Sequence, residues 1–185
     1  MNKNKQIILL IILIIFICII IIYSIKENFI ILTNAFAGSN KCLDINNNGP
    51  NNTLIMNPCS DNNTGQQWSG IYLNNSNNSN SNNSNSNSYN FNNITNSFIG
   101  TNNCLDIDNS QNSVIMNQCT NSNTQTWTIK KYNDSDDYYT ISSNNLNNKC
   151  IDIINDGVNN NKLNIKPCGA YSGQLWKIQT DNTKL

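Results

Sequence analysis

The sequence contains no histidine and no arginine. Histidine is the side chain that titrates nearest neutral pH and the commonest transition-metal ligand, so its absence removes the usual general base and metal site. The 11 basic residues are all lysine and balance 11 acidic residues to zero formal charge. This balance gives no electrostatic case for nucleic acid as a partner. We predict no metal and no cofactor.

Long apolar runs are also scarce, with one exception at the N-terminus. Lys3 and Lys5 precede an unbroken apolar run over residues 7–22. A positive region before such a run is typical of a signal peptide, although the run approaches the about 20 residues of a membrane span. We predict that residues 1–24 are a signal peptide or signal anchor, with any cleavage near Ser24. A membrane anchor through residues 7–22 stays open. Both alternatives place the rest of the chain on the non-cytoplasmic side, either secreted or at the cell surface.

Six of the seven cysteines fall into pairs of similar spacing, and the seventh, Cys18, lies in the apolar run. Even numbers of cysteines at such spacing in an exported chain indicate disulfides, whereas zinc would need closer pairs or histidine. Closing a loop of about 15 residues contributes about 3 kcal/mol in the chain-entropy model. The predicted disulfides are Cys42–Cys59, Cys104–Cys119 and Cys150–Cys168.

One pattern occurs three times in the same order. It reads C-[LI]-D-I, a polar loop, an apolar strand that ends in cysteine, and then Q-x-W. Three ordered copies indicate an internal repeat. The C-[LI]-D-I segments begin at Cys42, Cys104 and Cys150, and the Q-x-W segments end at Trp68, Trp127 and Trp176, which are all the tryptophans of the chain.

Each repeat predicts short β-strands. C-[LI]-D-I alternates apolar and polar residues, as a half-buried strand does, and turn residues interrupt the chain every few positions. Two further strands are predicted per repeat, one before the first cysteine and one from the tryptophan, which makes four per repeat and twelve in all. These strands are residues 29–33, 98–99 and 139–141, and residues 68–73, 127–131 and 176–179.

The first two repeats are further apart than the last two. Cys42 and Cys104 are 62 residues apart, whereas Cys104 and Cys150 are 46 residues apart. The excess corresponds to residues 74–90, an Asn/Ser tract with almost no apolar content. Such a tract cannot bury enough surface to offset its ordering entropy. We predict that residues 74–90 are a disordered insertion that leaves the core intact.

The triplicated C-[LI]-D-I and Q-x-W motifs with their cysteine pairs resemble the ricin B-chain type lectin family. The resemblance implies that residues 25–185 form an all-β fold, a β-trefoil of three four-stranded repeats. It also implies that Trp68, Trp127 and Trp176 fill the core. In that family, the aspartate accepts hydrogen bonds from sugar hydroxyls, and the glutamine of Q-x-W orients it. The implied carbohydrate-binding pairs are Asp44 with Gln66, Asp106 with Gln125, and Asp152 with Gln174.

The chain departs from the family where a sugar ring would stack. Sugar-binding members usually carry an aromatic residue just before the second cysteine, but here Asn57, Asn117 and Lys166 stand there. Tyr171 could supply an aromatic face to the third repeat from another direction. The preferred single site is therefore Asp152, Gln174 and Tyr171.

Three function classes follow from these observations. The first is a carbohydrate-binding module with glycans or glycoproteins as partners, and the alternative is a non-sugar β-trefoil that binds a protein partner. An enzyme is not expected, because the aspartates occupy equivalent repeat positions and no nucleophile constellation is present. N-x-[ST] sequons are frequent, as expected by chance in an Asn-rich chain, so no occupancy was assigned to them. They begin at Asn51, Asn62, Asn74, Asn77, Asn82, Asn93 and Asn133.

Overall fold

The computed structural model describes residues 11–16, 29–46, 53–71, 73, 88–108, 110, 112–133 and 135–180. Residues 11–16 are helical. No helix in these described ranges is long and apolar enough to cross a membrane. Most of the predicted signal segment, residues 1–24, lies outside the described residues and stays a prediction.

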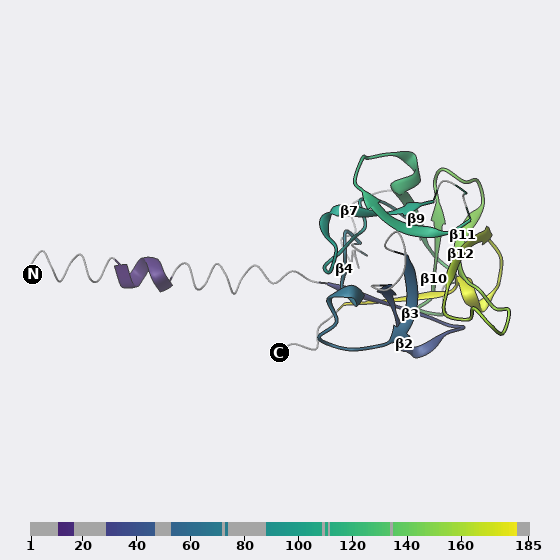
Figure 1. Ribbon diagram of the computed structural model, residues 1–185, viewed down its shortest axis with the longest axis horizontal. Coiled ribbons are helices and arrows are strands. Elements are labelled where there is room, and N and C mark those ends of the chain that lie inside the picture. The colour runs from purple at the N-terminus through teal and green to yellow at the C-terminus, as the bar shows by residue number, and fades with distance from the viewer. Residues whose placement is uncertain are drawn as a thin grey trace, which may run out of the picture.

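In the rest of the described chain the regular structure is β-strand, as predicted, apart from short 3-10 helices. The repeats lie around one centre, with β2 and β3 at the bottom of Figure 1, β7 at the top and β11 and β12 at the right. The first repeat contains β1 (Ile30–Asn34), β2 (Gly38–Ile45), β3 (Leu54–Pro58) and β4 (Trp68–Ser69). The second contains β5 (Ser88–Asn92), β6 (Thr95–Asn96), β7 (Gly100–Ile107), β8 (Val114–Gln118) and β9 (Thr126–Lys131). The third contains β10 (Tyr139–Ser143), β11 (Lys149–Ile153), β12 (Leu163–Pro167) and β13 (Trp176–Thr180).

The first and last strands of the repeats close into a barrel. Within each repeat the first strand pairs with the last, through Ile30↔Trp68, Phe91↔Trp127 and Tyr139↔Trp176. Between repeats, β4 pairs with β6, β9 pairs with β10, and β13 pairs with β1. This closed ring of antiparallel pairs leaves no free edge among the barrel strands, which is the usual way in which small all-β domains protect their edges.

The two middle strands of each repeat form hairpins, namely β2–β3, β7–β8 and β11–β12. Isolated bridges between Thr53 and Ile115 and between Ile55 and Lys162 join the hairpins to one another. The three predicted disulfides are confirmed: Cys42–Cys59, Cys104–Cys119 and Cys150–Cys168, with Cα–Cα distances of 5.0–5.1 Å. Each disulfide ties the start of a hairpin to the loop that leads into Q-x-W.

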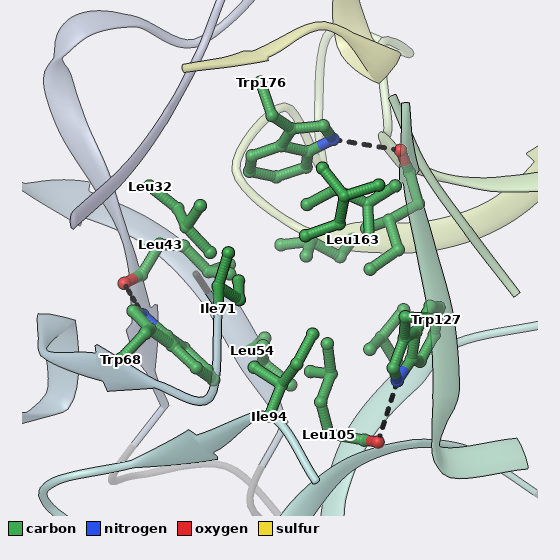
Figure 2. Close-up of a cluster of buried hydrophobic side chains, with 14 of the residues drawn as sticks. Leu32, Leu43, Leu54, Trp68, Ile71, Ile94, Leu105, Trp127, Leu163 and Trp176 are labelled. Carbon is green, nitrogen blue, oxygen red and sulfur yellow. Dashed lines mark hydrogen bonds between the residues drawn. The ribbon is translucent and has the colours of Figure 1, made fainter. Parts of the chain in front are cut away.

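The three tryptophans are fully buried, as predicted, and surround the leucines and isoleucines of one core (Figure 2). Each indole N–H donates to the backbone carbonyl that precedes the aspartate of C-[LI]-D-I. The distances are 3.0 Å to Leu43, 3.0 Å to Leu105 and 3.2 Å to Ile151. Because a buried indole needs a hydrogen-bond partner, this contact fixes the strand that carries the aspartate relative to the core.

Two buried asparagines join neighbouring repeats. Asn34 Nδ2 donates to the Gly173 carbonyl of the third repeat at 2.9 Å, and Asn96 Nδ2 donates to the Gly65 carbonyl of the first at 2.8 Å. Their Oδ1 atoms accept the backbone N–H of Phe36 and Phe98, which lie in the following turns. Each asparagine therefore sets the position of one hairpin turn against the Q-x-W loop of another repeat.

The first strand of the second repeat differs from the prediction. Phe98 and Ile99 were predicted as strand, but residues 97–99 form a turn and Phe98 is 52% exposed. The strand is instead split into β5 and β6 on either side of Asn93, which has a left-handed φ of 59°. Residues 88–90, predicted as part of the insertion, begin β5. The predicted insertion is therefore too long at this end, while residues 74–87 lie outside the described part of the chain.

The last strand of the first repeat is also shorter than predicted. Residues 68–73 were predicted as strand, but β4 ends at Ser69. Gly70 follows with a φ of 88°, and a Cβ there would lie 2.7 Å from the Asn93 carbonyl oxygen. Only glycine combines this backbone conformation with such a close approach.

Replacing Trp127 by phenylalanine tests the role of the indole contact. The variant loses the N–H that satisfies the buried Leu105 carbonyl and leaves a small void. We expect the free energy of unfolding to fall by about 2–4 kcal/mol. Urea unfolding of the oxidised protein measures it, and Tyr132→Phe, at a side chain 40% exposed, serves as the aromatic control with a change under about 0.5 kcal/mol. A Trp127→Phe loss no larger than the control would contradict this role.

Candidate functional site

Asp44 in the first repeat is buried, with 3% of its surface exposed. Its Oδ2 accepts hydrogen bonds from Asn57 at 3.0 Å, from Asn63 at 2.8 Å and from Gln66 at 3.1 Å. Its Oδ1 accepts the Ile45 backbone N–H at 2.8 Å. The predicted pair with Gln66 is thus present, but the carboxylate is enclosed by donors of its own repeat.

The glutamine of Q-x-W closes the loop around this carboxylate. Gln66 Nε2 also donates to the Pro58 carbonyl at 2.9 Å, and its Oε1 accepts the Ser60 N–H at 2.9 Å. The 3-10 helix η2 (Thr64–Gln66) places Gly65 against Asp44, where any side chain would collide with the carboxylate. The loop therefore covers Asp44 closely, and glycine is what permits it.

Asp106 in the second repeat has the same arrangement with fewer donors. It is 5% exposed, and its Oδ2 accepts from Gln125 at 3.0 Å and from Asn117 at 3.3 Å. Its Oδ1 accepts the Ile107 N–H at 2.7 Å. Gln125, at the end of η3 (Asn123–Gln125), also holds the Gln118 carbonyl. The carboxylate of this repeat is again bonded internally.

Asp152 in the third repeat is different, because it is only partly buried. Gln174, the last residue of η4 (Ser172–Gln174), bonds to the Pro167 carbonyl and to the Gly169 N–H. Within the described part of the chain, however, no amide side chain donates to Asp152, so the predicted pair with Gln174 is close in the fold but not hydrogen-bonded.

The missing donors trace to two positions of the repeat. Lys166 replaces Asn57 and Asn117, and Tyr171 replaces Asn63 as the residue before the 3-10 helix. Burial therefore raises the pKa of Asp152 above its ordinary value of 3.8, although the Lys166 ammonium and the Ile153 N–H oppose the shift. The carboxylate has lost part of its hydration without gaining the donors that its counterparts have.

A cavity of about 600 Å³ opens beside Asp152. Its walls come from two repeats, because Phe36 of the β1–β2 turn reaches it from the first. The side chains with polar or aromatic groups around it include Phe36, Asp152, Asp156, Asn164, Lys166 and Tyr171.

Asn164 provides a second acceptor next to Asp152. The two residues are direct cross-strand partners on β11 and β12. Asn164 Oδ1 is a buried oxygen without a hydrogen-bond partner, the single such side-chain atom in the described residues. Buried polar atoms are normally paired. The first two repeats have Ile55 and Ile115 at this position, so the acceptor is particular to the third repeat.

Tyr171 supplies an exposed aromatic face, with 65% of its surface exposed. A Cβ at Gly169 would lie 2.5 Å from a carbon of the Tyr171 ring. The ring therefore lies against the backbone at Gly169, which the absence of a side chain permits. Ser60 and Thr120 occupy this position in the other repeats, so the placement of the ring depends on a glycine found only here.

Asp156 belongs to a rigid turn at the edge of the cavity. Its Oδ1 accepts the N–H groups of Val158 and Asn159, and its Oδ2 accepts Asn159 Nδ2. The side-chain and backbone hydrogen bonds of Asn159 and Val158 lower the pKa of Asp156 to about 2. This exposed carboxylate remains ionised in acid, in contrast to Asp152.

Sequence reasoning placed Asp152, Gln174 and Tyr171 together but missed Phe36, Asn164 and Asp156. The sequence signal for Asn164 was present, because it is polar where the aligned residues are isoleucine. Phe36 could not be found from the third repeat, since it comes from a different repeat. No group of three histidine, cysteine or acidic side chains that could hold a metal occurs in the described ranges.

Comparison with known proteins gives a family and a fold. Residues 90–185 match the ricin-type beta-trefoil lectin domain family. No curated protein sequence matches the chain. Among solved structures, the designed three-fold symmetric protein ThreeFoil superposes with a TM-score of 0.58 at 17% identity, covering 82% of this chain and 97% of that one.

Two natural proteins also contain the fold. The Polyporus squamosus lectin, solved with Neu5Acα2-6Galβ1-4GlcNAc bound, has a TM-score of 0.59 at 16% identity, covering 84% of this chain and 50% of the lectin. An endo-β-galactosidase from Clostridium perfringens has a TM-score of 0.59 at 15% identity, covering 83% of this chain and 32% of the enzyme. The chain thus spans only part of both proteins, and at these identities the likeness concerns the fold.

The contrast between the aspartates predicts opposite effects on stability. Asp44→Asn places an amide among three amide donors, so we expect the free energy of unfolding at pH 7 to fall by about 1–3 kcal/mol. A raised pKa means that the folded state disfavours the ionised form of Asp152 relative to the unfolded chain. Asp152→Asn removes that charge, so we expect unchanged or slightly higher stability. Urea unfolding of both variants measures this, and equal losses would contradict it.

Proposed function

Because the chain belongs to the ricin-type beta-trefoil lectin domain family, we propose that it is a carbohydrate-binding module whose ligand pocket lies in the third repeat. The observation that carries this proposal is the position of Asp152, which has no amide side-chain donor among the described residues, beside the unpaired Oδ1 of Asn164 on β11 and β12. Sugars present neighbouring hydroxyl donors, which match a carboxylate and an amide oxygen held together.

The internal symmetry of the protein supports this assignment. In the first two repeats the equivalent carboxylate receives its donors from asparagine and glutamine of the same repeat. In the third repeat lysine and tyrosine replace the asparagines of the first, and Gln174 bonds to Pro167 and Gly169 instead of Asp152. A ligand would have to supply the missing donors. Asp44 and Asp106 were also predicted to bind sugar, but their burial favours a structural role, so the proposal is confined to the third repeat.

Aromatic faces at the cavity support the same ligand class. Phe36 and Tyr171 both border it, and the apolar faces of sugar rings pack on aromatic rings. Their positions differ from the place just before the second cysteine, where the resembling lectins carry their aromatic residue. Lys166 occupies that place and offers a charged donor instead. We propose that the module binds glycans without catalysing a reaction on them.

Export of the protein is part of the proposal. Three disulfides in a chain of this size are typical of proteins that fold in an oxidising compartment. The apolar run over residues 7–22 supplies a route, either as a cleaved signal or as an anchor. We propose that residues 25–185 are displayed on the non-cytoplasmic side, where glycans and glycoproteins are found.

Two substitutions should supply hydrogen-bond donors to Asp152 from the protein itself, in place of a ligand. Lys166→Asn with Tyr171→Asn gives the third repeat the donors that the first repeat uses around Asp44. We expect binding to fall about ten- to a hundred-fold, as for loss of one or two hydrogen bonds to a charged group. The measurement is a glycan-array screen of the oxidised, multivalently displayed protein, followed by titration of the best glycan.

The controls separate binding from folding. Asp152→Asn should lose binding without losing stability, whereas Tyr132→Ala, outside the pocket, should bind as the unmodified protein does. If the folded protein binds no glycan on the array, the carbohydrate proposal fails, and a protein-binding β-trefoil becomes the better reading. If the double variant binds as before, the ligand pocket is not in the third repeat.

Binding should also weaken in acid. Ionised Asp152 offers two charged acceptor oxygens to sugar hydroxyls, whereas protonation removes the charge and turns one of these oxygens into a donor. Its pKa is raised above 3.8, so affinity should fall as the pH drops through a value above 3.8. Asp156, with a pKa of about 2, stays ionised there and does not contribute. Glycan titrations between pH 7 and pH 4 test this, with Asp156→Asn expected to keep the same midpoint. Affinity that is constant down to pH 3.8 would contradict the role of Asp152.

A further inference from the structure

Three of the N-x-[ST] sequons have their asparagine within the described residues: Asn62, Asn93 and Asn133. In an exported protein such an asparagine can carry an N-linked glycan, which is bulky and must project into solvent. The sequence cannot rank these sites, because an Asn-rich chain generates sequons by chance. The environment of each side chain in the fold does rank them.

Asn93 is poorly placed to carry a glycan. It lies between β5 and β6 with a left-handed φ of 59°, and its Nδ2 donates to Asn121 Oδ1 at 3.0 Å. The next residue, Ile94, is completely buried, and Thr95 pairs with Ser69 and Cys104 in the sheet. A glycan here would have to leave a packed barrel strand.

Asn133 is engaged in its own turn. Its Nδ2 donates to Asp136 Oδ2 at 2.9 Å, and its Oδ1 accepts the Asp136 N–H at 2.8 Å and the Ser135 hydroxyl. A glycan on Nδ2 would compete with the hydrogen bonds that join Asn133 to Ser135 and Asp136. This site is less suited than an unengaged asparagine.

Asn62 has neither obstacle. It is exposed in a turn closed by the hydrogen bond from Asn63 N–H to the Ser60 carbonyl at 3.1 Å. Within the described residues no hydrogen bond engages its side chain. Thr64, which supplies the sequon hydroxyl, is exposed as well.

The neighbours of Asn62 hold this turn in place. Asn63 donates to Asp44 and accepts the Gly65 N–H at 2.9 Å, and Gln66 at the end of the loop bonds to Pro58 and Ser60 at its start. The loop is therefore fixed from the inside by Asn63, while the preceding residue faces solvent with nothing to displace.

We propose that Asn62 carries an N-linked glycan. Its Nδ2 forms a bond to the anomeric carbon of an oligosaccharide carried on a lipid diphosphate. The bond from that carbon to the diphosphate oxygen breaks, and the lipid diphosphate leaves with the amide proton. The proposal requires export into a compartment with such a donor, but it does not depend on sugar binding by the third repeat.

The glycan would cover the face of the first repeat that corresponds to the pocket of the third. Counted back from the Q-x-W glutamine, Asn62 occupies the position of Ala170, which lines the cavity beside Asp152. In the first repeat, the position that lines the cavity in the third would thus carry an attached carbohydrate. It lies near the Asp44 carboxylate, which donors of its own repeat already enclose.

The test is site-resolved mass spectrometry of the full chain secreted from a glycosylating eukaryotic host. N-glycans are removed by the amidase that converts the asparagine to aspartate, in water labelled with heavy oxygen. Chymotrypsin is needed for digestion, because no lysine lies between Lys41 and Lys130. We expect the label at Asn62 in most copies of its peptide, and not at Asn93 or Asn133.

Matched variants confirm the assignment. Asn62→Gln and Thr64→Ala should each lower the intact mass by one glycan, whereas Asn93→Gln and Asn133→Gln should leave it unchanged. Both Asn62→Gln and Thr64→Ala should retain the glycan affinity of the third repeat. An unlabelled Asn62 peptide in the secreted wild-type protein, or occupancy of Asn93 or Asn133 with Asn62 empty, overturns the proposal.

Discussion

The hydrogen bond from each tryptophan indole to the carbonyl before the aspartate is the interaction on which the rest of the structure depends. It joins the two repeated motifs, Q-x-W and C-[LI]-D-I, at one buried point in each repeat. The indole ring fills the common core (Figure 2), and its N–H fixes the adjacent strand. The glutamine two residues before the tryptophan then reaches the loop after the second cysteine. The tryptophan of each repeat therefore takes part both in core packing and in positioning the strand that carries the aspartate.

The three repeats share this arrangement of tryptophan and aspartate, and they differ in the side chains that surround the aspartate carboxylate. Asparagines enclose the carboxylates of the first two repeats, whereas lysine and tyrosine leave Asp152 partly open in the third. A partly buried carboxylate without amide donors and an unpaired amide oxygen do not help the fold, since buried polar groups without enough partners destabilise it. Their retention in one repeat of three is understandable if a ligand supplies the donors, and the two closed repeats then carry the stability of the frame.

Asparagine illustrates the limit of composition as a guide. Because asparagine is so abundant, the sequence gives no reason to assign a role to any single asparagine. In the structure, however, Asn34 and Asn96 are buried and join neighbouring repeats. Asn93 permits the left-handed residue that splits a barrel strand, a conformation that asparagine tolerates better than most residues. The two parts of this strand therefore lie before Phe98 and Ile99, and this apolar pair occupies a turn. No local pattern could reveal these roles, because each depends on a partner elsewhere in the chain.

The sequence by itself determined the repeat, the disulfide partners and the all-β class, because these follow from spacing and alternation within each copy, and the family resemblance of its motifs implied the tryptophan core. It also placed Asp152, Gln174 and Tyr171 in one repeat. Only the tertiary structure decided which carboxylate is open, since that depends on donors brought together by the fold, and it added Phe36 from another repeat and the unpaired oxygen of Asn164. The physical reason is that hydrogen-bond satisfaction belongs to the assembled site, whereas periodicity belongs to the chain.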